Sequence, residues 1–129
     1  MTIHNLGSKT TTSQLHAVAV VSATASGSVA YLDLQPYEGD MVFVLDHAAA
    51  GSGVTLTAAI QHSDTTTSGD FTNVTGGAFT AAAANTAGFS VITLNTDGLK
   101  RYVRVRFTVS GGSGTGAASV IAIGSQKYL

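Results

Sequence analysis

The carboxylates and histidines of this chain are the side chains that could support acid–base or metal chemistry. Hydrolysis of a glycosidic bond needs two carboxyl groups that face each other across a cleft. Glu38 and Asp40 are close enough in sequence to suggest such a pair, but Pro36 and Gly39 place them in a loop. Nearly all of the seven carboxylates fall at expected strand ends or in turns, where aspartate caps the backbone. The seven are Asp33, Glu38, Asp40, Asp46, Asp64, Asp70 and Asp97.

The histidines carry no complete metal-ligand pattern. The four are His4, His16, His47 and His62. No two of them have His-x-His or His-x-x-x-His spacing, and the nearest clusters, Asp46–His47 and His62–Asp64, lack a third ligand in register. Cysteine is absent, which excludes disulfides, thiolate chemistry and zinc–sulfur sites. The sequence therefore predicts no metal site.

The glycine-rich motifs of catalysis and phosphate binding are also incomplete. Thr115 stands where a Gly-x-Ser-x-Gly elbow around Ser113 needs its second glycine. The run from Gly111 to Gly116 has the length of a phosphate loop, but Ala117 stands where the lysine belongs. A strand is expected after it instead of a helix, so no helix dipole is available for phosphate. We therefore predict no catalytic residue and no cofactor site.

One basic cluster follows a turn in the last third of the chain. It comprises Lys100, Arg101, Arg104 and Arg106. Tyr102 precedes Arg104 and Arg106 on one face of the expected strand, an arrangement that could stack bases or pair with phosphates. A solvated strand face explains the cluster most simply, a salt-bridged contact with a neighbouring protein comes second, and nucleic acid third. The net charge of −1 favours neither nucleic acid nor an anionic membrane.

The strand that carries these arginines has the clearest structural pattern of the chain. Apolar side chains occupy positions 103, 105, 107 and 109, and polar ones occupy 104, 106 and 108. This period of two is typical of a strand with one buried and one solvated face. A glycine-rich run at 110–116 and a second apolar run at 120–123 follow. A strand, a flexible turn and a strand predict a hairpin.

Further strands are predicted at fairly even spacing. Met41–Leu45 is apolar throughout, which suggests burial on both faces, whereas 54–61 alternates. Pro36 predicts a loop at 35–39, and Gly76 and Gly77 are expected to stop a short strand before them. The predicted strands are 15–22, 28–34, 41–45, 54–61, 71–74, 89–94, 103–109 and 120–123. About eight antiparallel strands with turns at this spacing predict an all-β sandwich or barrel.

The composition indicates a surface that other chains cover. Charged residues make up 10% of the 129 residues, against about 25% in ordinary soluble domains. Such a surface is poorly protected against association, although a monomer kept soluble by threonine stays an alternative. Residues 1–14 carry no sustained period and are expected to form an extended arm before one domain at 15–129, with a frayed terminus as the alternative. No apolar run approaches the roughly 18 residues that span a bilayer.

The chain from about residue 54 to 124 resembles small all-β virion proteins of tailed bacteriophages, of the capsid decoration or cement type. The segments that carry the resemblance are LTAAIQHSD at 56–64, FTNV at 71–74 and LKRYVRVRFTVSGG at 99–112. The resemblance implies a jelly-roll-like sandwich, often trimeric, that sits on a capsid lattice and has no catalytic residues.

We therefore expect a single antiparallel β-sandwich of jelly-roll type that is not an enzyme and that binds and stabilises a phage capsid. The expected partners are the major capsid protein and copies of the chain itself, with a trimer favoured and with neither nucleic acid nor membrane. The expected location is the capsid surface of the virion, after assembly in the host cytoplasm. Contacts are expected in the arm and in the loops 35–40, 46–53 and 64–70. The candidate contact residues are Thr10, Thr11, Thr12, Tyr37, Glu38, Arg104 and Arg106.

Two other functions stay open. The chain could serve elsewhere in a virion, in the tail or at the head–tail connector. It could also be a carbohydrate-binding sandwich in which Tyr31, Tyr37 and Tyr102 supply aromatic platforms, although the absence of tryptophan counts against this function.

Overall fold

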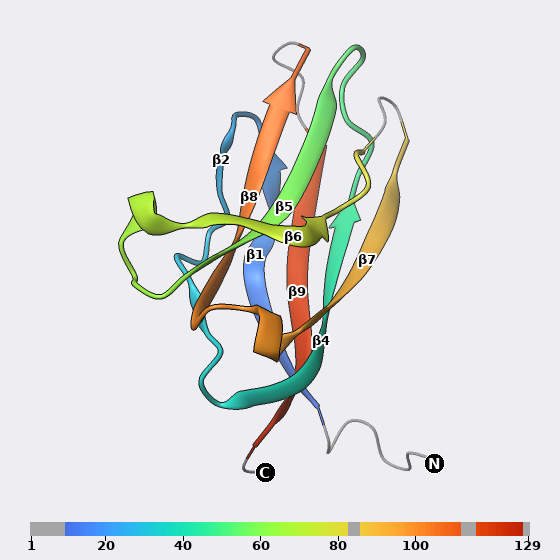
Figure 1. Cartoon of the computed structure of the whole chain (residues 1–129). Helices are drawn as coiled ribbons and strands as arrows, with labels where there is room; N and C mark the ends of the chain where they lie inside the picture. The colour runs from blue at the N-terminus through green and yellow to red at the C-terminus, as the bar shows by residue number, and fades with distance from the viewer. Residues whose placement is uncertain (1–9, 83–85, 112–115, 128–129) are drawn as a thin grey trace.

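The chain forms two antiparallel sheets that pack face to face (Figure 1). The computed structural model describes residues 10–82, 86–111 and 116–127. The four-stranded sheet has the order β1 (Thr11–Val21), β9 (Gly116–Gln126), β4 (Tyr37–His47) and β7 (Gly88–Asn95). The five-stranded sheet has the order β2 (Ala25–Ser26), β8 (Tyr102–Ser110), β5 (Thr55–Ser63) and β6 (Thr72–Ala78), with β3 (Leu32–Asp33) also paired to β8.

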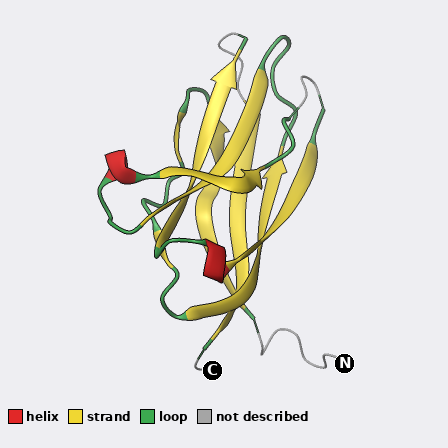
Figure 2. Ribbon diagram, in the orientation of Figure 1, coloured by secondary structure: helices red, strands yellow, loops and turns green. Residues whose placement is uncertain are grey.

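Helix is confined to two single turns in the described part of the chain (Figure 2). These 3-10 turns are Ser68–Asp70 and Thr96–Gly98. Within the described residues, no helix has the length and apolar character needed to cross a membrane.

The strand pairs are nested along the chain. The first strand, β1, pairs with the last, β9; β2 and β3 pair with β8; β4 pairs with β7; and β5 pairs with β6. Two further pairs, β4 with β9 and β5 with β8, join these ladders into sheets. Such nesting is a long antiparallel ribbon folded over on itself, which is the jelly-roll topology. The predicted all-β jelly-roll sandwich is confirmed.

The core lies between the two sheets and is built from the inward side chains of alternate positions. In β5, Leu56, Ala58 and Ile60 are buried, as the alternation in the sequence predicted. Both sheets contribute large side chains that are almost completely buried. They are Leu15, Met41, Phe43, Leu45 and Val120 from the four-stranded sheet, and Ile60, Val103, Val105 and Phe107 from the five-stranded sheet. Removal of these groups from water is the main force that holds the two layers together.

The predicted hairpin at the C-terminal end is wrong. Both of its segments are strands, but β8 lies in the five-stranded sheet and β9 lies in the four-stranded sheet. The glycine-rich run therefore joins the two layers instead of reversing the chain within one of them. Alternation of apolar and polar residues shows which side chains face inward, but it does not show which distant strand is the hydrogen-bonded neighbour.

The predicted arm is shorter than expected. β1 begins at Thr11 rather than at Leu15, because Thr11–Gln14 pair with residues 121–124 of β9. The Ser13 hydroxyl also forms a hydrogen bond of 2.7 Å with the Tyr37 hydroxyl of β4. Residues 1–9 of the predicted arm lie outside the described residues.

Three other strand bounds differ from the prediction. β4 begins at Tyr37, two residues before the end of the predicted loop, and β6 continues through Gly76 and Gly77 to Ala78. The strand predicted at 28–34 is reduced to the two residues of β3. Before this segment, the Gly27 amide donates to the Val105 carbonyl of β8 at 2.9 Å, and residues 28, 30 and 31 are exposed.

Replacement of Gly27 tests how tightly this segment is packed. A Cβ at Gly27 would lie 2.6 Å from both the Leu15 carbonyl oxygen and Val105 Cγ1. We expect Gly27→Ala to lower the free energy of unfolding by roughly 1–3 kcal/mol, because the backbone cannot move away without breaking the ladder. Gly69→Ala is the matched control, since nothing lies within 4 Å of its added Cβ. Urea unfolding midpoints of the two variants should differ clearly, and equal midpoints would contradict this packing.

Candidate interaction surfaces

Glu38 and Asp40, which the sequence placed in a loop, both lie in strand β4. Asp40 accepts a hydrogen bond of 2.9 Å from the side-chain amide of Asn95, across the β4–β7 ladder, and Glu38 is exposed. Among the described residues, no group of three or more histidine, aspartate or glutamate side chains is placed to hold a metal ion.

Arg104 is buried, so the prediction that it lies on a solvated strand face is wrong. Its Nε donates to Gln61 Oε1 at 2.9 Å, one terminal nitrogen donates to Ser68 Oγ at 2.8 Å, and the guanidinium lies 4.4 Å from the centre of the Phe71 ring. Burial, followed by the charge of Arg106, lowers the pKa of Arg104. The segment between β5 and β6 folds back over the arginine, so Arg104 fastens this segment to the outer face of the five-stranded sheet.

The other predicted contact residues differ in how accessible their side chains are. Tyr37 is 5% exposed and its hydroxyl is bonded to Ser13, so its side chain is not available to a partner. Thr10 and Thr11 are half-buried, and Thr12 is exposed on β1. Arg106 is half-buried and donates to Ser26 Oγ at 3.3 Å. Of the seven candidates, Thr12 and Glu38 have the most accessible side chains.

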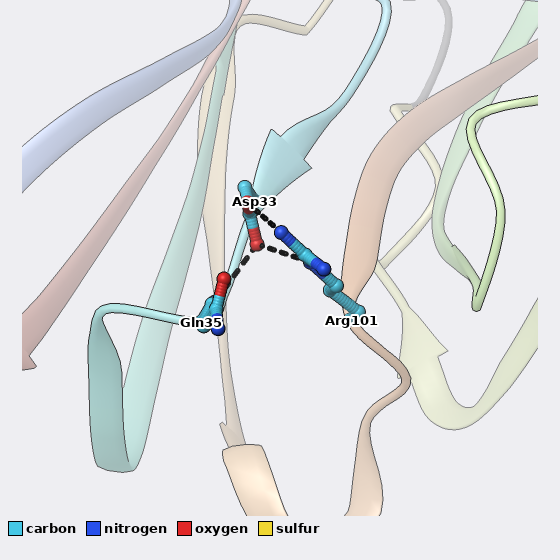
Figure 3. Close-up of polar contacts among 3 residues, drawn as sticks. All are labelled: Asp33, Gln35 and Arg101. Atoms are coloured by element: carbon cyan, nitrogen blue, oxygen red, sulfur yellow. Dashed lines mark hydrogen bonds and ion pairs between the residues drawn. The ribbon is translucent and has the colours of Figure 1, made fainter.

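One end of the sandwich gathers charged side chains. Arg101, which immediately precedes β8, forms an ion pair of 3.0 Å with Asp33 of β3, and Asp33 also accepts from the backbone amide of Gln35 (Figure 3). The hydrogen bond from Arg101 holds the pKa of Asp33 below its usual value. A shallow hollow of about 350 Å³ beside this pair is lined by charged residues such as Glu38 and Lys127 and also by the apolar Leu34 and Leu99. Because both partners of the ion pair are exposed, it contributes little stability.

The three tyrosines proposed as a sugar platform do not come together. Tyr31 and Tyr102 pack edge to face with ring centres 5.1 Å apart, and Arg101 lies 5.0 Å from the centre of the Tyr102 ring. Tyr37 is buried elsewhere in the core. Only the rings of Tyr31 and Tyr102 lie together, and the Tyr31 side chain is 41% exposed.

The outward face of the four-stranded sheet is apolar, and we call it the apolar face. Its large side chains are Val18 and Val20 of β1, Ile121 and Ile123 of β9, Val42 and Val44 of β4, and Phe89 and Val91 of β7. Val18, Val20, Phe89 and Val91 are 75%, 61%, 73% and 49% exposed. They are four of the five large hydrophobic side chains that the described part of the chain leaves exposed. Exposed apolar side chains gathered on one surface mark a site of interaction with another molecule.

The register of the strands brings the central valine and isoleucine side chains together, whereas Asp46 of β4 lies between Phe89 of β7 and Ser119 of β9. Val44 of β4 lies directly between Val91 of β7 and Ile121 of β9, and Val42 lies next to Ile123. A shallow hollow of about 300 Å³ opens on the same face and is lined partly by Phe89. Sequence reasoning did not identify this surface. The feature of the sequence that indicates this surface is the apolar run at 41–45, which predicts a strand buried on both faces.

Two histidines have pKa values below the usual one. His16 lies edge to face on Phe107, its Nδ1 accepts from the Ser28 amide at 3.0 Å, and its Nε2 is buried without a partner among the described residues. Burial lowers the pKa of His16 from its usual value of 6.5. Burial, followed by Lys100, also lowers the pKa of His62, whose Nδ1 accepts from the Lys100 amide at 3.2 Å.

The chain belongs to the Bbp16 family, whose model matches residues 15–123. No curated protein matches the sequence. Among solved structures, the fold is similar to that of VP2 in the infectious bursal disease virus subviral particle, with a TM-score of 0.62 and 13% identity over 92% of this chain. This chain spans 32% of that VP2 chain. The SPBc2 prophage-derived protein YomS is similar over nearly its whole length, with a TM-score of 0.56 and 13% identity over 89% of this chain and 91% of YomS.

Arg104→Met tests whether the buried guanidinium fastens the β5–β6 segment. The substitution keeps the apolar stem and removes both hydrogen bonds and the contact with Phe71, so we expect the free energy of unfolding to fall by roughly 1–3 kcal/mol. Arg106→Met on the same strand face is the control and should cost less than about 1 kcal/mol, since its guanidinium makes one longer bond. Chemical denaturation of both variants measures the difference. A loss no greater than that of the control would show that Arg104 does not have this role.

The lowered pKa values of His16 and His62 predict a loss of stability in mild acid. As the pH falls below 6.5, the unfolded chain takes up protons that the folded chain does not, so stability decreases until the folded-state pKa values are reached. We expect a lower urea midpoint at pH 5.5 than at pH 7.5, and a smaller difference for His16→Gln, whose amide oxygen can still accept from Ser28. An unchanged pH dependence in His16→Gln would show that this ring does not contribute.

Proposed function

We propose that this chain is a decoration protein that binds the outside of a phage capsid and stabilises its lattice. The observation that carries the proposal is the apolar face, a surface of exposed valine, isoleucine and phenylalanine side chains on an otherwise weakly charged sandwich. A sandwich with this surface is suited to permanent contact with other proteins, because obligate interfaces are the more hydrophobic ones. The proposed role is therefore structural rather than enzymatic, at the capsid surface of the virion.

Two similarities support a virion role. The segments at 56–64, 71–74 and 99–112 resemble capsid decoration proteins of tailed phages. The fold is shared with the VP2 protein of a viral particle and with a prophage-derived protein, although identities of 13% carry the fold alone. Another position in the virion, in the tail or the connector, is the nearest alternative.

Polar surfaces are proposed to contact the shell in addition to the apolar face. The exposed residues Thr12 and Glu38, and the exposed loop at 64–70, are accessible to a partner and carry hydroxyl and carboxylate groups. A decoration protein meets its shell after it has folded, so this contact surface must tolerate water beforehand. The major capsid protein is the proposed partner, together with copies of this chain, for which a trimer is the form that the resemblance favours.

Carbohydrate binding is the second candidate, because Tyr31 and Tyr102 form an exposed edge-to-face pair beside Arg101. Aromatic rings of this kind present an apolar face and a polar edge to a ligand. The pair lies on the five-stranded sheet, away from the apolar face, so the two functions can be tested separately.

Binding to emptied capsids tests the proposed function. We expect the purified chain to co-sediment saturably with emptied shells of the phage that carries its gene, and to raise the temperature at which those shells break. A Tyr102→Ala variant should bind the shells as the natural chain does. Absence of binding to shells, or saturable binding to a glycan array that Tyr102→Ala abolishes, would contradict the capsid role and favour carbohydrate recognition.

A further inference from the structure

β7 is an edge strand without the features that usually protect an edge. It lies last in the four-stranded sheet, and β4 is its single ladder partner in the described part of the chain (Figure 1). Its sequence, GFSVITLN, contains no proline and no charged residue, and its eight pairs with β4 follow one another without a bulge. Open edges of this kind readily pair with further strands, so proteins usually interrupt, charge or cover them.

The other edges of the sandwich are interrupted. The register of β1 shifts twice along β9, and that of β6 shifts once along β5. β6 also contains Gly76, whose φ of +78° departs from the extended conformation of a strand. β2 and β3, which end the five-stranded sheet at its other side, have two residues each. Among the described strands, β7 therefore presents the one long and regular edge.

The register shows which backbone groups of β7 point to this edge. The Ala48 amide donates to the Ala117 carbonyl at 2.8 Å, one residue beyond the last pair of the β4–β9 ladder. Hydrogen-bonded pairs alternate along an antiparallel ladder, so the even-numbered residues of β4 bond to β9 and the odd-numbered ones bond to β7. Odd-numbered residues of β4 lie opposite even-numbered residues of β7. The amide and carbonyl groups of Phe89, Val91 and Thr93 therefore point away from β4.

The side chains of β7 indicate what kind of segment fits this edge. Phe89 and Val91 are exposed on the outer face, whereas Ile92 and Leu94 pack against the core and stay only half-buried. Side chains alternate between the two faces of a sheet, so a further strand would cover the first two residues with one set of side chains and the second two with the other set. The matching segment is therefore extended, uncharged and apolar on both sides.

We propose that an extended segment of the shell protein adds to β7 as a fifth strand of the four-stranded sheet. This inference rests on the proposed function, which supplies the shell as the partner, and it states how the partner is held. Backbone hydrogen bonds give strand addition its affinity, and alternate side chains give its specificity. A single segment fits better than the edge of a second folded sandwich. The reason is that β6, which lies beside β7, is bulged, so only one of the two layers can continue.

Hydrogen exchange measures the occupation of this edge directly. In the free chain, the amides of Phe89, Val91 and Thr93 should exchange fast, because the β4 ladder gives them no partner, while those of Ile92 and Leu94 should be protected. Binding to emptied shells of the phage that carries the gene should slow the first three at least tenfold, as read by mass spectrometry of a peptide that covers β7. Protection of these three amides before shells are added would show that another copy occupies the edge, and would overturn the proposal.

Two substitutions at one exposed position of β7 test the same edge by binding. Thr93→Pro removes an edge amide and should weaken co-sedimentation with the emptied shells at least tenfold, whereas Thr93→Ser keeps the amide and should bind as the natural chain does. Proline is tolerated where an edge amide has no partner, so the variant should still unfold cooperatively. If it does not fold, the exchange of the natural chain decides.

The outcomes separate this inference from the proposed function. Equal shell binding by Thr93→Pro and Thr93→Ser, or shell binding without slowed exchange in β7, would overturn the strand addition and leave the decoration role standing. A natural chain that does not bind the shells would contradict the decoration role and this inference together.

Discussion

The pairing of the first strand with the last is the constraint on which the rest of this structure depends. β1 and β9 lie side by side at the two ends of the chain. The other strand pairs are nested between them in the sequence, so their pairing follows from the pairing of β1 with β9. The nesting brings β4 beside β9 and β5 beside β8, so the inward faces of two sheets can enclose a single core. Phe43 and Phe107, one from each sheet, are both almost completely buried there. The loops and outer faces take their positions from this framework.

The two outer faces of the sandwich differ in how far described segments of the chain cover them. On the five-stranded sheet, the segment after β5 returns over the strands, and Arg104 holds it through Ser68 and the Phe71 ring. On the four-stranded sheet, no described segment covers Val44 and its neighbours, and the side chains at the two edges are the most exposed hydrophobic groups of the described chain. This asymmetry gives the low charge content of the sequence a structural meaning. Several of the few charges, among them Arg101, Glu38 and Lys127, lie together at one end of the sandwich.

Several parts of this description could be read from the sequence. The alternation at 54–61 and 103–107 identified the strands and their buried sides, and the absence of complete catalytic motifs directed attention to surfaces. The candidate contacts were less predictable. Tyr37 and Arg104 are polar residues beside a loop and on a strand face, and their burial depends on Ser13, Gln61 and Ser68, which lie between 24 and 43 residues away.

The sequence by itself determined that the chain is a series of short strands with one apolar side each, because the two-residue period of a strand is a local property of the backbone. The tertiary structure alone decided which strands are neighbours, since hydrogen bonds between distant segments set the order of a sheet. It therefore also decided that the glycine-rich run after β8 joins two layers, that Arg104 is enclosed, and that Val42, Val91 and Ile121 meet on one surface. When a strand has apolar residues on both sides, its sequence does not show whether the second side packs against its own chain or against another chain.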